Sequence, residues 1–330
     1  MNITEKLAKE FKLKQSQVES TVQLIDDGNT IPFIARYRKE MTGALSDVTL
    51  RALDERLTYL RNLEQRKEEV IRIIEEQGKL TDELKEEILK AEVLQRVEDL
   101  YKPFRQKKST RASKAKEKGL EPLAMVFWAQ ELETGTPEEL AAQYVDEEKG
   151  VANAEEAIQG AMDIIAEMIA DNPELTAAVR ERTQRAGLIA SEAADPNEST
   201  VYDLYYNFSE GISKIPDHRV LAINRGEKEK KLKVKVIAPV EEIHKDMRDF
   251  VIKNEKSIFA GLLSDVIEDS YKRLMAPSIE REMRNLLTER AEREAVKVFA
   301  KNTEKLLMAP PVKNARIISI DPGYRTGCKV

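Results

Sequence analysis

The chain has 330 residues, of which 41% are hydrophobic and 35% are charged, and its formal net charge is −6. The single cysteine, Cys328, excludes an intrachain disulfide and a cysteine-based zinc site, and no run of about 18 apolar residues could span a membrane. The amphipathic start lacks the apolar core of a signal peptide, so we expect a reduced, cytoplasmic protein. Few aromatic residues, glycines and prolines accompany many helix-forming residues, and this composition predicts a mainly α-helical fold.

The N-terminal part of the chain has the apolar spacing of helices. Two short helices are predicted within residues 1–28, and another over 31–41. A long helix is predicted over 47–77, because its leucines and isoleucines recur mostly three or four positions apart and therefore share one face. Ser46 or Asp47 is expected to cap it, so this helix is a rigid spine with defined ends.

The rest of the chain is predicted to be helical, with one β-hairpin. Several helices are expected over 120–213. The runs 219–225 and 232–238 flank a charged turn and predict two paired strands. Helices resume over 241–275, and a second long spine over 278–308 is stopped by a Pro-Pro pair.

The last residues resemble the start of a new domain. Residues 315–320 predict a buried strand, and Asp321 follows at its C-terminal edge within DPGYRTGCK. The remaining strands of such a sheet are absent from the chain. We therefore expect this to be the N-terminal part of a longer protein, in which any site built around Asp321 is incomplete.

Charge divides the chain unevenly. Residues 1–118 carry 25 basic against 22 acidic side chains, residues 119–213 carry 4 against 20, and residues 214–330 carry 25 against 18. Together with the prolines, this pattern predicts four consecutive segments, in which the last block is divided into 214–311 and 312–330. The acidic block is either a solvated helical face or a segment that stays away from nucleic acid while the basic blocks approach it.

A basic connector at 101–118 is the main candidate for nucleic-acid binding. It holds eight basic residues and one acidic residue, flanked by Tyr101 and Phe104, and at least its first half is expected to be a loop. Its cations could contact phosphates without reading bases, or the connector could simply be solvated. The candidate residues are Lys102, Arg105, Lys107, Lys108, Arg111, Lys114 and Lys116.

Two other groups of cations are expected to have structural roles and not to bind a ligand. Arg36 and Arg38 lie two positions apart and cannot share a helical face, so one of them is expected to form an internal ion pair. Lysines at the predicted hairpin tip are expected to prevent edge-to-edge association of strands. These are Lys228, Lys230, Lys231, Lys233 and Lys235. Phosphate-loop and His-Glu-x-x-His zinc motifs are absent, so no cofactor and no metal site is expected.

Five stretches occur together in an order that resembles the Tex family of bacterial transcription accessory proteins. They cover most of the chain and are specific in combination. The stretches are IPFIARYRKEMTGALSD at 31–47, LYKPFR followed by KSTRASKAKEKGLEPLA within 100–124, GVANAEEAIQGAMDIIAE at 150–167, HRVLAINRGEKEK at 218–230 and DPGYRTGCKV at 321–330.

The resemblance implies an N-terminal helical region with a helix-turn-helix-like part. A ribonuclease-H-like domain of the YqgF type, helix-hairpin-helix elements and an S1 (OB-fold) domain follow it in the family. Such proteins bind nucleic acid and act with the transcription machinery, and a eukaryotic elongation factor shares the architecture. This chain would hold the helical region and only the first strand of the ribonuclease-H-like domain.

Asp321 is the one position where the resemblance raises the question of catalysis. Ribonuclease-H-like nucleases use several carboxylates to hold two metal ions, and one aspartate cannot supply that geometry. The resemblance implies that the Tex domain lacks the full acidic set, so Asp321 is expected to be a structural relic that caps the turn at Gly323.

We therefore expect a monomeric, non-enzymatic protein that binds RNA, DNA or both through their backbones. The alternatives are a protein-interaction scaffold that uses the acidic block 119–213, and the N-terminal part of a metal-dependent nuclease.

Overall fold

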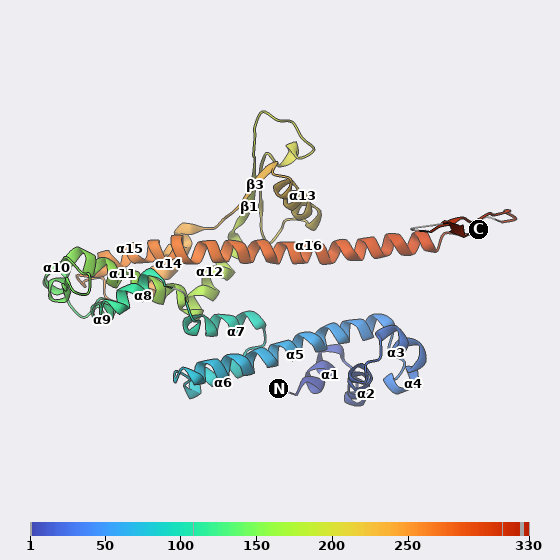
Figure 1. Ribbon diagram of the computed structural model, residues 1–330, viewed down its shortest axis with the longest axis horizontal. Coiled ribbons are helices and arrows are strands. Elements are labelled where there is room, and N and C mark those ends of the chain that lie inside the picture. Colours follow the sequence, from blue (N-terminus) through green and yellow to red (C-terminus); the bar gives the residue numbers. More distant parts are fainter. Residues whose placement is uncertain (1, 108, 312, 324–326, 330) are drawn as a thin grey trace. The chain divides into compact units, whose positions relative to one another are not determined.

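The computed structural model describes residues 2–107, 109–311, 313–323 and 327–329, and it is mainly α-helical, as predicted (Figure 1). The chain forms two compact units. Unit 1 contains Met1–Arg180 and Glu241–Ala276, and unit 2 contains Glu181–Val240 and Pro277–Val330. The four consecutive segments predicted from charge and prolines stay a prediction. Among the described residues, no helix has the length and apolar character needed to cross a bilayer.

The first helices of unit 1 pack against a long spine, α5 (Asp47–Glu76), as Figure 1 shows. The predicted spine is confirmed: the Ser46 hydroxyl accepts a hydrogen bond from the Thr49 backbone N–H at 3.1 Å, and the leucines of one face are buried. The predicted helix over 31–41 is broken at Arg38, where φ is −131°. The helices before the spine are α1 (Ile3–Phe11), α2 (Gln15–Asp26), α3 (Ile31–Tyr37) and α4 (Lys39–Thr42).

The C-terminal half of α5 packs against α6 (Asp82–Lys90) and α7 (Leu94–Tyr101). The remainder of unit 1 gathers around α11 (Ala154–Asp171), most of whose apolar side chains are buried. Gly160 allows close packing here, because a Cβ atom at this position would lie 2.3 Å from Leu120 Cδ1. The other helices are α8 (Arg111–Glu117), α9 (Glu121–Ala129), α10 (Pro137–Ala141), α12 (Pro173–Ala186, which continues into unit 2), α14 (Val240–Val251), α15 (Ala260–Asp269), the π-helical turn η4 (Ser270–Met275), and the 3₁₀ turns η1 (Lys102–Phe104) and η2 (Ala142–Tyr144).

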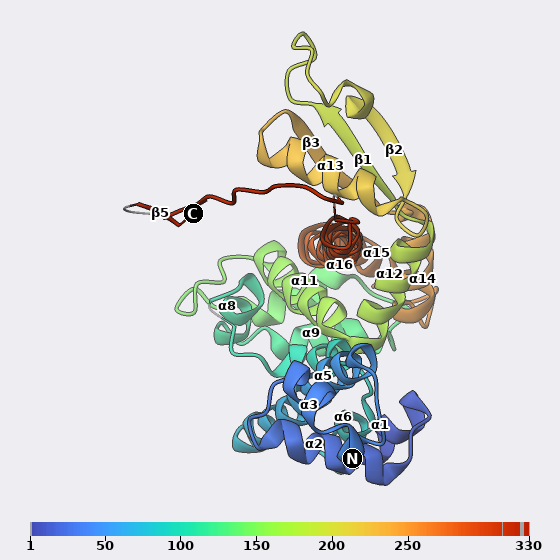
Figure 2. The same ribbon diagram turned by 90° about the vertical axis from the view of Figure 1, so that its right-hand side faces the viewer.

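Unit 2 combines a three-stranded antiparallel sheet with helices (Figure 2). The strand order is β2-β1-β3, and Ile189 of the central strand lies opposite Glu210 and Val236. Glu280 of the long helix covers part of the β3 edge, since its carboxylate accepts a hydrogen bond from the Val236 backbone N–H at 2.9 Å. The elements are β1 (Leu188–Ala193), η3 (Asp203–Tyr205), β2 (Asn207–Gly211), α13 (Asp217–Lys228), β3 (Leu232–Ile237) and α16 (Ala276–Leu307).

The predicted hairpin is wrong. Residues 219–225 belong to α13, and β3 pairs with β1, which lies in a region predicted to be helical. The run Val-Leu-Ala-Ile is too short to distinguish the periods of a strand and a helix. The deciding signals are the three-residue spacing of the buried Val220, Ile223 and Gly226, and Asp217 in the positive first turn.

The C-terminal segment also differs from its prediction. No strand forms over 315–320, and the side chains of Ile317, Ile318 and Ile320 are exposed. The short strands β4 (Asp321–Pro322) and β5 (Cys328–Lys329) pair with each other instead. Among the described residues no other strand lies beside 315–320, so its backbone lacks the ladder partner that a strand needs.

Candidate nucleic-acid interface

The basic connector begins at the end of α7 and contains η1 and α8, all within unit 1. Pro103 fixes the short turn η1, and regular structure resumes at Arg111, where Thr110 and Ser113 form a reciprocal capping box. The first half is therefore largely irregular, as predicted, and the second half is a helix.

Two connector lysines are held against the protein. Lys102 Nζ donates a hydrogen bond to the Ala170 carbonyl oxygen at 2.7 Å, and burial lowers the pKa of Lys102. Lys107 forms ion pairs with Asp171 and, at 3.3 Å, with Glu167. Burial raises the pKa of Asp171, while the hydrogen bond and the charge of Lys107 oppose that shift. Lys102 and Lys107 therefore neutralise the C-terminal turn of α11, where helix carbonyls favour cations.

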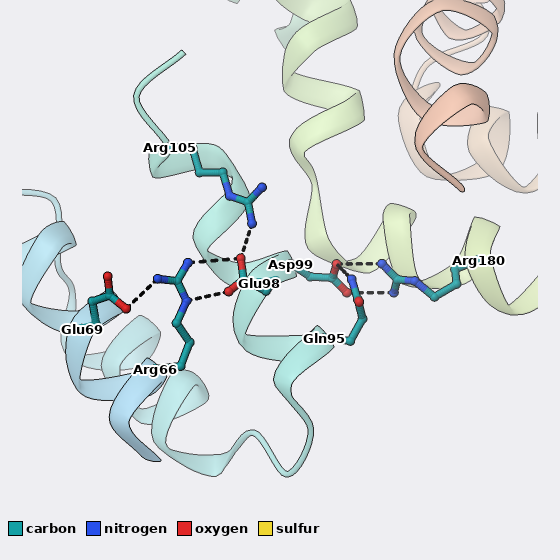
Figure 3. Close-up of polar contacts among 7 residues, drawn as sticks. All are labelled: Arg66, Glu69, Gln95, Glu98, Asp99, Arg105 and Arg180. Carbon is teal, nitrogen blue, oxygen red and sulfur yellow. Dashed lines mark hydrogen bonds and ion pairs between the residues drawn. The ribbon is translucent and has the colours of Figure 1, made fainter. Parts of the chain in front are cut away.

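Two further cations form ion pairs at the surface. Arg105 pairs with Glu98, which also accepts hydrogen bonds from Arg66 at 2.6 and 3.3 Å (Figure 3). Lys116 pairs with Glu121 at 2.9 Å. The Lys116 pair is exposed on both sides, and such pairs contribute little stability and are screened by salt, so a phosphate could compete for the Lys116 ammonium group.

The remaining described candidates lie open on α8. Arg111 and Lys114 are exposed, and within the described part of the chain neither has a carboxylate oxygen within 4.0 Å of its charged nitrogens. Arg111 acts at longer range, because its charge is one cause that lowers the pKa of Asp269. Lys108 lies outside the described residues. Among the described candidates, Arg111 and Lys114 are therefore the two whose charged groups have neither an ion pair nor a hydrogen bond to the protein.

A hollow of about 550 Å³ lies between the connector and α11. Charged side chains of both signs line it, including Arg105, Lys107, Lys116, Glu167 and Asp171. This mixture of charge suits neither an anion nor a cation alone, so the exposed face of α8 is the better surface for a polyanion.

A buried ion pair joins α7, the helix that leads into the connector, to α12. Asp99 of α7 accepts hydrogen bonds from both terminal nitrogens of Arg180 on α12, at 2.7 and 2.8 Å, and one from Gln95 at 3.1 Å (Figure 3). The Asp99 residue is 4% exposed. A bidentate contact of this kind fixes orientation as well as distance, so it holds α7 and the N-terminal part of α12 together. Sequence analysis missed this pair, because residues 81 positions apart give no local signal of contact.

Replacing Glu98 with glutamine is expected to make the stability of unit 1 less dependent on pH in acid. Burial opposes ionisation of Glu98, but Arg66 and Arg105 outweigh it, so the pKa of Glu98 lies below its usual value. Its stabilising contribution is therefore present above the unfolded pKa and is lost as the pH falls through the folded pKa. The difference in unfolding free energy between wild type and Glu98→Gln should be about 1–2 kcal/mol at pH 7 and should shrink below about pH 4.

Urea unfolding at a series of pH values measures this difference. The matched control is Glu86→Gln, which removes an exposed ion pair with Lys90 and should leave stability almost unchanged at every pH. If the difference in unfolding free energy between wild type and Glu98→Gln stays constant down to pH 3, the ionised Glu98 carboxylate is not the source of the stabilisation.

The other predicted functional positions are not assembled into a site. Asp321 is exposed on β4, and the described residues contain no cluster of three or more His, Cys, Asp or Glu side chains with metal-binding geometry. Of the five predicted tip lysines, Lys231 pairs with Glu198 and Lys235 pairs with Glu192. Because β3 is an edge strand, its lysines still fit the predicted protective role.

The expected internal pairing of Arg36 or Arg38 is wrong. Both side chains are exposed, and within the described residues neither lies within 4.0 Å of a carboxylate oxygen. The break at Arg38 ends α3 and separates the two arginines onto different helices, so the helical-face argument does not apply to them.

Family models match most of the chain. The model described as Tex central region-like matches residues 133–299, and the model described as Tex-like protein N-terminal domain matches residues 1–75. These two matches contain α1–α4, nearly all of α5, and α10–α15.

Three relatives extend the similarity over the full length of the chain. It is 48% identical over 334 residues to the Bacillus subtilis protein YdcI, covering 99% of this chain and 46% of YdcI. It is 36% identical over 337 residues to the transcriptional accessory protein Tex of Neisseria gonorrhoeae, covering 100% of this chain and 44% of that protein. It is 30% identical over 345 residues to S1 RNA-binding domain-containing protein 1 of Pongo abelii, covering 100% of this chain and 34% of the relative.

The chain therefore spans less than half the length of these curated relatives. The model of the central region alone matches about half of the 330 residues, and the N-terminal model adds the first helices in the order that the sequence resemblance predicted. On these matches, the chain belongs to the Tex family.

Proposed function

We propose that this chain binds nucleic acid without catalysing a reaction, as part of a protein that acts with the transcription machinery. Relatives named as a transcriptional accessory protein and as an S1 RNA-binding domain-containing protein support a role near RNA. The observation that carries the proposal for this chain is the exposed face of α8, where Arg111 and Lys114 have no carboxylate oxygen within 4.0 Å in the part of the chain that the structure describes.

The proposed contacts are electrostatic. Cations on one exposed helical face can each neutralise a phosphate and release counterions, which gives affinity without base recognition. The hydrogen bond of Lys102 and the ion pairs of Lys107 and Arg105 serve a different purpose, because they hold the connector on α11 and α7. In this proposal the paired cations hold the connector in place, and Arg111 and Lys114 bind the phosphates.

No chemistry is assigned to Asp321 in this proposal. The family resemblance implies that residues 312–330 begin a ribonuclease-H-like domain, and Asp321 would be its first carboxylate. A two-metal site needs several carboxylates at fixed positions, and the described residues around Asp321 do not supply them.

The expected result is salt-sensitive binding of single-stranded RNA. Fluorescence anisotropy with an oligonucleotide of about 20 residues should show log K falling linearly with log salt, with a slope near −0.7 for each phosphate contacted. Changing a neutral osmolyte instead of salt is the control and should leave the affinity unchanged.

Two outcomes would contradict the proposal. One is the absence of binding at low ionic strength, and the other is binding that does not respond to salt. The absence of binding would favour the alternative in which the acidic block 119–213 binds a basic protein. Several carboxylates of that block already form internal ion pairs, among them Glu167, Asp171 and Glu174, which weakens this alternative.

A further inference from the structure

The corner formed by α3 and α4 exposes the Tyr37 ring beside the half-buried Phe33, together with two guanidinium groups. We call the side chains of Phe33, Arg36, Tyr37 and Arg38 the α3–α4 platform. Tyr37 is 56% exposed, and its ring centroid lies 5.2 Å from that of Phe33. Arg38 lies over the Phe33 ring at 5.3 Å, and Arg36 lies 6.0 Å from the centre of the Tyr37 ring. An aromatic surface bordered by two cations is therefore accessible from solvent.

The charges of the platform are not neutralised by the protein. From Arg36 to Arg105, every other arginine has a carboxylate oxygen within 4.0 Å, whereas Arg36 and Arg38 have none among the described residues. The stretch 30–46 contains one acidic residue, Glu40, against three basic residues. Within this range of the described chain, these two arginines are therefore the ones left available to a ligand.

The platform is supported by a rigid base. Ile34 is fully buried in a cluster with Leu24, Leu45 and Leu50, so one side of α3 is fixed while the other carries the platform. The buried Thr42 hydroxyl hydrogen-bonds to the Lys39 carbonyl oxygen at 3.3 Å. The corner then closes at Gly43, whose φ of +64° favours glycine. Little ordering is needed before a ligand binds, which favours affinity.

We propose that the α3–α4 platform binds single-stranded nucleic acid, with a base stacked on Tyr37 or Phe33 and phosphates beside Arg36 and Arg38. Exposed aromatic rings bordered by cations suit a single strand, because unpaired bases can stack while the backbone lies against positive charge. A duplex offers no unstacked base. The inference rests on the proposed nucleic-acid binding and adds a second surface to it, separate from the connector.

Anisotropy with oligouridine, oligothymidine and a duplex of equal length tests the platform in the full chain. Tyr37→Ala should weaken binding of both single strands by about fivefold or more, and Tyr37→Phe should preserve it, since a base stack contributes roughly that factor or more. Arg36→Ala with Arg38→Ala should reduce the magnitude of the salt slope by about 1.4, which corresponds to two contacts at about 0.7 each. The duplex should be insensitive to Tyr37→Ala.

The charge-matched control is Lys79→Ala with Lys85→Ala. Both lysines are exposed and have no carboxylate oxygen within 4.0 Å among the described residues, so the control removes the same charge at another surface. Circular dichroism checks that each variant is folded. Photocrosslinking with an iodouridine-containing strand gives a second readout, in which the crosslink should map to residues 33–38.

The outcomes separate this inference from the proposed function. If wild type binds single strands but the Tyr37 and arginine variants bind equally well, or if the crosslink maps elsewhere, the platform is not the site and the proposed function stands. If wild type binds no nucleic acid at low salt, both are overturned. A stronger effect on RNA than on DNA would identify RNA as the ligand, and equal effects would assign the platform to either strand.

Discussion

Replacing Asp99 with alanine is expected to lower the unfolding free energy of unit 1 by about 3–5 kcal/mol, because Arg180 would lose its bidentate contact with the Asp99 carboxylate in a largely buried position. Urea unfolding measures the total loss, and hydrogen exchange locates it. Exchange should increase in α7 and in the N-terminal part of α12, the two elements that the pair joins.

A double variant separates the contribution of the ion pair to stability from the cost of leaving one buried charge without the other. Removing both charges with Asp99→Ala and Arg180→Met should recover part of the loss, because the buried guanidinium group is removed together with the carboxylate that it contacts. The control is Asp47→Ala at the exposed pair with Arg51, which should change stability by less than about 0.5 kcal/mol. If Asp99→Ala lowers the unfolding free energy no more than Asp47→Ala does, the pair does not hold α7 and α12 together.

Replacing Ile34 with alanine is expected to cost about 2–4 kcal/mol, since the fully buried side chain would leave a cavity among Leu24, Leu45 and Leu50. The matched control is Val48→Ala in the first turn of α5, where the side chain is 77% exposed and a change of less than about 0.5 kcal/mol is expected.

Ile34 also connects stability to binding. Its removal should weaken single-stranded binding although it lies in the core, because the platform would lose its fixed base. Tyr37→Ala should act the other way, with a loss of binding and almost no loss of stability. Equal stability of Ile34→Ala and wild type would contradict the packing described for this corner.

The sequence was sufficient wherever a local signal determined the structure. The spine α5 has a capping Ser46, apolar residues on one face and Gly78 after its end, and each signal lies within a few residues of what it controls. The mainly helical fold follows from the same kind of information. Local signals failed at α13, where a short apolar run suits two periods, and at β1, whose partners lie far along the chain.

The connector shows the same limit at the level of function. The sequence predicted seven candidate cations, and their residue types alone make them equivalent. In the structure Lys102 and Lys107 are taken up by the end of α11, and Arg105 by Glu98, through contacts that depend on long-range packing. The charge that remains available to a ligand is therefore a property of the fold, and the count of basic residues overstates it.

The connector offers a direct comparison, because two of its cation pairs differ mainly in whether the protein has already neutralised them. The variants Arg105→Ala with Lys107→Ala and Arg111→Ala with Lys114→Ala each remove two positive charges from the same segment. Any effect of net charge on a polyanion is therefore matched, and the salt slope of single-stranded RNA binding reports the direct phosphate contacts.

The salt slope of single-stranded RNA binding shows which connector cations contact the nucleic acid. We expect the Arg111 and Lys114 variant to reduce its magnitude by about 1.4, and the Arg105 and Lys107 variant to leave it unchanged. A slope that falls only in the Arg105 and Lys107 variant, or that falls equally in both, would contradict the claim that internal ion pairs decide which cations of this chain bind nucleic acid.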